Sequence, residues 1–168
     1  MNFYYLDASA WIKRYYQESG TAWIQKFFAK NESKACASLG LIEVISTLAR
    51  KKKAKEINAK LFEQKALEVD TDWIRFIQIK LTDDVVEIAK DLAKELSLRG
   101  ADAVHLASAL VLQKRFAEED DRLTFVSSDL ELNRAAESKG LVVIDPNKQK
   151  ERAILRPGKK EKKKTGRK

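Results

Sequence analysis

Several residue types with distinctive chemistry are scarce in this chain of 168 residues. A single cysteine, Cys36, excludes an internal disulfide and agrees with a reducing cytoplasm. With one histidine and one cysteine in the chain, zinc lacks its usual set of nitrogen and sulfur ligands. No glycine-rich loop ending in Lys-Ser or Lys-Thr is present, so the phosphate-binding loop of nucleotide hydrolases is also excluded.

Long apolar runs are absent as well. Nothing approaches the roughly 20 consecutive apolar residues of a membrane-spanning helix, so we expect no membrane association. The first residues lack the positive region and apolar stretch of a signal peptide. The expected location is the cytoplasm.

The net charge of +8 is unevenly distributed. Residues 148–168 contain 11 Lys or Arg and 2 Glu, a net charge of +9. The other 147 residues contain 22 basic and 23 acidic groups, a net charge of −1. We therefore expect one folded domain over residues 1–147 and a basic, disordered tail over residues 148–168.

Within residues 1–147, short apolar runs alternate with helical patterns. The runs predict strands over 3–6, 34–37, 76–81, 123–126 and 141–144. The patterns between them predict helices over 8–17, 20–30, 39–53, 56–73, 84–98, 102–117 and 130–139. This alternation is typical of an α/β protein with a parallel sheet.

Two aspartates follow predicted strands directly. Asp7 comes after the first strand and Asp129 after the fourth, each just before a predicted helix. Both positions suit a helix N-cap. The carboxyl ends of parallel strands also form the ligand crevice of α/β proteins, so both carboxylates are candidates for one cleft.

Two further acids lie on predicted helices. Asp102 begins a helix that is apolar almost all round, where the helix dipole alone does not offset the cost of burial. Glu43 lies away from the apolar stripe of its helix, which fits either a solvated face or a site with room for a ligand. Because burying unpaired carboxylates is costly, such a set of four acids indicates a bound metal ion.

Each of these four acids lies in a short segment of its own. The first is Tyr-Leu-Asp7-Ala-Ser-Ala-Trp and the second is Gly-Leu-Ile-Glu43-Val-Ile-Ser. The third is Gly-Ala-Asp102-Ala-Val-His-Leu-Ala and the fourth is Val-Ser-Ser-Asp129-Leu-Glu-Leu. Together these segments resemble the PIN-domain nucleases, and are most similar to VapC-like toxins. The resemblance spans residues 3–146 in the expected order, and the basic extension after Pro146 departs from it.

The resemblance implies a three-layer α/β/α sandwich with a central parallel sheet, in which the first and fourth strands are adjacent. It also implies Mg²⁺ or Mn²⁺, hydrolysis of RNA phosphodiester bonds, a small antitoxin partner and a homodimer. Catalysis is then expected from Asp7, Glu43, Asp102 and Asp129. Of these, Asp7, Asp102 and Asp129 would be metal ligands, and Glu43 would orient a metal-bound water.

Other residues are candidates for supporting roles. Hydroxyls that would orient the carboxylates belong to Ser9, Ser127 and Ser128. Basic groups expected to contact RNA are Lys13, Arg14, Lys159, Lys160, Lys162, Lys163 and Lys164. His105 is either a core residue or a partner of Asp102, and a lone histidine excludes a metal-free ribonuclease mechanism that needs two.

Alternatives to a toxin remain open from the sequence. One is an RNA-processing or ribosome-associated PIN protein. Another is a non-catalytic RNA-binding module that uses the tail, although a pure binder gains nothing from four negative charges gathered against RNA. A structural partner protein is the third.

Overall fold

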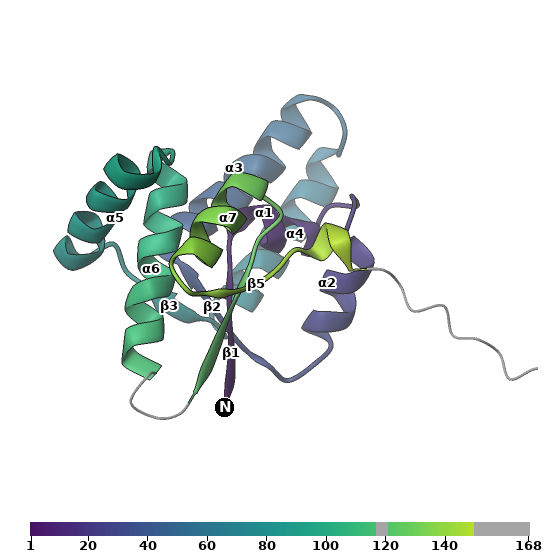
Figure 1. Cartoon of the computed structure of the whole chain (residues 1–168). Coiled ribbons are helices and arrows are strands. Elements are labelled where there is room, and N and C mark those ends of the chain that lie inside the picture. Colours follow the sequence, from purple (N-terminus) through teal and green to yellow (C-terminus); the bar gives the residue numbers. More distant parts are fainter. Residues whose placement is uncertain (117–120, 150–168) are drawn as a thin grey trace, which may run out of the picture.

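The computed structural model describes residues 1–116 and 121–149. Its centre is a sheet of five parallel strands in the order β3-β2-β1-β4-β5 (Figure 1). The strands are β1 (Asn2–Leu6), β2 (Ser33–Ala37), β3 (Ile77–Ile79), β4 (Arg122–Val126) and β5 (Val142–Ile144). The predicted parallel α/β sheet is confirmed, and β3 is shorter than its expected range of 76–81.

The described part of the chain also contains seven α-helices and two short 3₁₀ helices. They are α1 (Ala8–Trp11), η1 (Ile12–Arg14), α2 (Thr21–Phe28), α3 (Ser38–Lys53), α4 (Ala59–Trp73), α5 (Asp83–Leu96), α6 (Gly100–Phe116), α7 (Leu130–Ser138) and η3 (Pro146–Lys148).

One helix differs clearly from expectation. The range 8–17 forms a single α-helical turn that tightens into η1 and ends at Arg14. Tyr15 is held instead by tertiary contacts, because its hydroxyl accepts from the Trp11 indole at 2.8 Å and donates to Asp72 of α4 at 2.7 Å. A contact distant in sequence thus overrides the local helical pattern.

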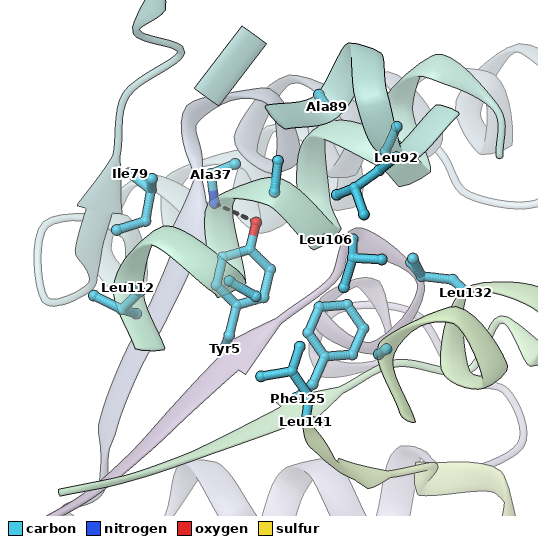
Figure 2. Close-up of a cluster of buried hydrophobic side chains, with 14 of the residues drawn as sticks. Tyr5, Ala37, Ile79, Ala89, Leu92, Leu106, Leu112, Phe125, Leu132 and Leu141 are labelled. Atoms are coloured by element: carbon cyan, nitrogen blue, oxygen red, sulfur yellow. Dashed lines mark hydrogen bonds between the residues drawn. The ribbon is translucent and has the colours of Figure 1, made fainter. Parts of the chain in front are cut away.

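Different helices cover the two faces of the sheet. Alternate residues of β1 point to opposite faces, as in any strand. Tyr5 packs in a cluster with α5, α6 and α7, and Leu6 packs in a second cluster with α1, α2, α3 and α4. Figure 2 shows the first cluster, in which the Tyr5 and Phe125 rings stack at 5.5 Å. Three layers result, as the resemblance implied.

Helix α6 is the most deeply buried helix of the first cluster. Seven of its residues are buried, including His105, Leu106 and Leu112. This agrees with its apolar pattern all round. Its first turn, which carries Asp102, lies near the carboxyl ends of the central strands.

Candidate active site

The carboxyl ends of β1 and β4 bring the first two acids together. The strands pair with Leu6 opposite Val126, and the Asp7 amide donates to the Val126 carbonyl at 3.0 Å. The chain leaves β1 toward β2 and β3, whereas β4 lies on the other side of β1 with β5 beyond it. The site therefore lies at a switch point of the strand order, where α/β proteins bind ligands.

Asp7 is only 4% exposed, and hydroxyl groups surround one of its carboxylate oxygens. Its Oδ2 accepts from the Ser9 amide at 3.2 Å, from the Ser9 hydroxyl, and from the Ser127 hydroxyl at 3.0 Å. The Ser9 hydroxyl also accepts from the Ser128 amide at 2.9 Å. The hydroxyls of Ser9 and Ser127 thus orient Asp7, and the Ser128 amide joins this network to the loop after β4. The Ser128 hydroxyl itself is buried without a hydrogen-bond partner among the described residues.

Asp129 is the N-cap of α7. Its Oδ1 accepts from the amides of Glu131 and Leu132, both at 2.9 Å. Its own amide donates to the Ser127 hydroxyl at 3.1 Å. The capping role and a place in the cleft are therefore compatible, because the cap uses Oδ1 and leaves Oδ2 outside these bonds.

Asp102 lies in the field of the other two aspartates. Partial burial, followed by the negative charges of Asp129 and Asp7, raises its pKa from 3.8 to about 6, against a smaller opposing effect of Arg99. A carboxyl group whose pKa is raised by burial and by neighbouring carboxylates is typical of sites that bind cations or carry out acid–base chemistry.

The hydrogen-bond partner of the Glu43 carboxylate is the imidazole of His105. His105 Nε2 lies 2.7 Å from Glu43 Oε2 and 3.5 Å from Asp7 Oδ1. Burial lowers the pKa of His105, but the bond to Glu43 and the charges of Asp7, Glu43 and Asp102 outweigh it and raise the pKa overall. His105 is thus a buried core residue whose partner is Glu43, not Asp102.

All four acids line one cleft with a cavity volume of about 550 Å³. Ser9 and Ser128 line it as well, and Ser127 lies beneath them, fully buried. Glu18 and Asn147 also line the cleft, and no signal in the sequence indicated either. Ser46, Thr47 and Arg50 line it as neighbours of Glu43 on the same side of α3. The helical spacing of Ser46, Thr47 and Arg50 from Glu43 is the signal that places them on its face.

The two basic residues after α1 point to different places. Lys13 lines the cleft, although it is only 4% exposed, and its ammonium pairs with Glu18 at 2.7 Å. Arg14 does not reach the cleft, because it bonds Asp72 and Gln25 and lies over the Phe28 ring. The tail residues Lys159, Lys160, Lys162, Lys163 and Lys164 lie outside the described residues.

The donor set of the cleft suits a hard divalent cation. Carboxylate and hydroxyl oxygens are the preferred ligands of Mg²⁺ and Mn²⁺. Over residues 1–116 and 121–149, no group of three or more acidic, histidine or cysteine side chains is arranged so that it could hold a metal ion. Mg²⁺ usually retains several waters and is bound through only one or two carboxylates, so a smaller set of these acids still fits it.

Comparison with known proteins gives the family. The PIN domain profile matches residues 4–138. Ribonuclease VapC45 and ribonuclease VapC49, from two strains of Mycobacterium tuberculosis, are each 34% identical over 116 residues. Each match covers 67% of this chain and 78% of the relative.

Solved structures share the fold at lower identity. VapBC2 of Rickettsia felis, bound to promoter DNA, is 17% identical with a TM-score of 0.56, covering 85% of this chain and 98% of that chain. DNA-bound VapBC of Salmonella typhimurium is 16% identical with a TM-score of 0.60, covering 87% and 99%.

No helix in the described ranges has both the length and the apolar character needed to cross a membrane. The acids at the ends of β1 and β4 and at the starts of α3 and α6, the parallel sheet and the sequence match agree with one another. This chain belongs to the PIN-domain family, in the group that contains the VapC ribonucleases.

Proposed function

We propose that the protein is a metal-dependent endoribonuclease that hydrolyses RNA phosphodiester bonds. One observation carries the proposal: Asp7, Asp102 and Asp129 line one cleft, where partial burial and then the charges of Asp129 and Asp7 raise the pKa of Asp102 to about 6. Such mutual repulsion is a cost that a bound cation removes. The ribonuclease names of the relatives at 34% identity support the same activity.

The residues divide into holding and orienting roles. Asp7, Asp129 and Asp102 would hold Mg²⁺ or Mn²⁺, with Asp102 bound directly or through water. When bound, the ion would lower the pKa of a coordinated water and offset charge on the phosphate. Ser9 and Ser127 orient Asp7 by donating to its Oδ2. Glu43, whose side chain is 32% exposed, orients the attacking water and accepts its proton.

Two sources of positive charge would bind the RNA backbone. Lys13 lines the cleft, and its ammonium, which is paired with Glu18, would contact a phosphate there. Residues 148–168, with a net charge of +9, would attract RNA without selecting a sequence. The cleft would then select the bond that is cut.

The test of this activity is incubation of purified protein with single-stranded and structured RNAs in Mg²⁺, Mn²⁺ or EDTA. Cleavage should need the metal and should be lost in Asp129→Asn, which keeps an oxygen for the cap. Glu131→Gln is the matched control, because Glu131 lies in the same helical turn but is exposed. Full activity of Asp129→Asn, or of wild type in EDTA, would refute the proposal.

The proposed biological role of this activity is that of the toxin in a toxin–antitoxin pair. VapBC structures of similar fold contain such pairs, which supports a small antitoxin partner here. Expression in the cytoplasm should arrest growth, and co-expression of a small neighbouring gene should relieve it. Harmless expression of active nuclease would favour an RNA-processing enzyme. The expected homodimer is tested by light scattering of the purified protein.

A further inference from the structure

A chain of buried hydrogen bonds runs from the backbone at the end of β2 to Glu43 in the cleft. The Ala37 amide donates to the Tyr5 hydroxyl at 3.1 Å, as Figure 2 shows. The Tyr5 hydroxyl lies 2.9 Å from His105 Nδ1. His105 Nε2 lies 2.7 Å from Glu43 Oε2. Tyr5 is 0% exposed and His105 is 1% exposed, so solvent does not compete for the bonds of the Tyr5 hydroxyl, whereas the bond to Glu43 is part-buried.

The polarity of this chain follows from its two ends. An amide can only donate, so the Tyr5 oxygen accepts from Ala37 and its own proton is free for Nδ1 of a neutral imidazole. At the other end, Nε2 faces the oxygens of two carboxylates, Glu43 and Asp7. Nε2 must therefore carry a proton and donate it to Glu43, whether the imidazole is neutral or charged.

The absence of a side chain at Gly40 leaves room for the imidazole of His105 beside α3. A Cβ at Gly40 would lie 3.0 Å from His105 Cε1 and 2.4 Å from Cys36 Sγ. A glycine in a helix is less favourable than an alanine, because it loses more backbone freedom on folding. Its place in the first turn of α3 allows the imidazole of α6 to approach closely enough to bond Glu43.

We propose that His105 is a positioning residue for the nuclease reaction. It fixes the Glu43 carboxylate relative to Asp7, because one imidazole edge lies within 2.7 Å of the first and 3.5 Å of the second. Tyr5 and the Ala37 amide fix the ring in turn. This inference rests on the proposed function, in which Glu43 acts on the attacking water.

Three variants test the positioning role by kinetics. His105→Leu removes the donor, whereas His105→Gln keeps an N–H group that can reach Glu43. Leu106→Val is the control, because it loosens the same buried helix without touching the chain of bonds. Partners that orient site residues typically contribute about 10- to 100-fold to activity.

We expect kcat to fall by about that factor in His105→Leu, with KM for RNA unchanged, and to recover in part in His105→Gln. Leu106→Val should melt earlier but keep its kcat. A folded His105→Leu with wild-type kcat, or a His105→Gln as impaired as His105→Leu, would overturn the inference.

Nuclear magnetic resonance tests the contact separately from activity. His105 is the single histidine of the chain, so ¹⁵N-histidine labelling gives one imidazole with no assignment problem. Nε2 should be protonated, its signal should move in Glu43→Gln, and the Nδ1 signal should move in Tyr5→Phe. An unprotonated Nε2, or imidazole signals that stay unchanged in both variants, would refute the inference even if the protein cuts RNA. The expected spectrum in a protein that cuts no RNA would instead refute the proposed function.

Discussion

The repulsion among the aspartates predicts that Asp102→Asn stabilises the metal-free protein. The rise of the Asp102 pKa from 3.8 to about 6 corresponds to an upper limit of about 3 kcal/mol, at 1.36 kcal/mol per unit. Because solvent screens this half-exposed carboxylate, about 1–1.5 kcal/mol is the realistic penalty. The amide also loses a favourable dipole interaction of roughly 0.3–1 kcal/mol, so the expected net gain is about 0.6 kcal/mol at the middle of these ranges and at most about 1.2 kcal/mol.

The pH dependence identifies the cause. Below pH 3.8 the carboxyl group is protonated in both the folded and the unfolded chain, so the penalty is absent. Between pH 3.8 and about 6 the unfolded chain loses the proton first, and the folded state becomes progressively less favoured. Above about pH 6 the penalty is complete, so the variant should show its full advantage at pH 8.

Thermal melting in EDTA at pH 8 and pH 4 measures this prediction. The variant should melt about 1–4 °C above wild type at pH 8, and the advantage should disappear toward pH 4. Asp83→Asn is the control, because Asp83 lies in the first turn of α5 and is exposed. It should lose only the dipole interaction and melt slightly lower than wild type.

Metal should reverse the order. Mg²⁺ stabilises whichever folded protein binds it more tightly, so it should raise the melting temperature of wild type more than that of Asp102→Asn. The reasoning fails if Asp102→Asn behaves like Asp83→Asn in EDTA, if its advantage persists at pH 4, or if Mg²⁺ shifts both proteins equally.

Three further predictions follow from the same structure. Asp7→Asn should abolish cleavage, and its free energy of unfolding should be lower than that of Asp129→Asn by about 1 kcal/mol. The reason is that the new amide N–H₂ must face either the serine donors or His105. Equal melting temperatures of the two variants would contradict this. Gly40→Ala should lower both kcat and the melting temperature, although alanine has the better helix propensity. The reason is that its Cβ would clash with Cys36 and His105. A more stable and fully active variant would refute the close contact. Truncation after Gln149 should flatten the slope of log affinity against log salt by about 3, if roughly four tail cations contact single-stranded RNA. Turnover at saturating RNA should be nearly unchanged. An unchanged slope in a salt titration would show that the tail does not bind RNA.

The fold and the first two acids were predictable because both depend on local rules. Alternating runs indicated the parallel sheet, and Asp7 and Asp129 follow strands that such sheets bring to one edge. The resemblance added that these two strands are neighbours, which the pairing of Leu6 with Val126 confirms. The roles of the four acids in catalysis stay predictions until the variants are measured.

Contacts between distant segments were not predictable in the same way. His105 bonds Glu43 across 62 residues, and only the closeness of α6 to Gly40 makes that pair possible. Arg14 lies away from the cleft because Asp72 and Phe28 hold it. Asn147 reaches the cleft because Pro146 packs against Gly20, which has a φ of +85° and no side chain in the way. Each outcome depends on a fit between surfaces that no single segment encodes.

The pairing of β1 with β4 also determines when the site can exist. Asp7 leaves the ribosome long before Ser127, yet its Oδ2 accepts a hydrogen bond from the Ser127 hydroxyl, 120 positions later in the chain. Contacts so distant in sequence form late, after most of a domain is available to fold. A nascent or truncated chain that stops before β4 therefore holds Asp7 without Asp129 and lacks a complete cleft. For a protein that cuts RNA, this order of assembly would protect the message and the ribosome during its own synthesis.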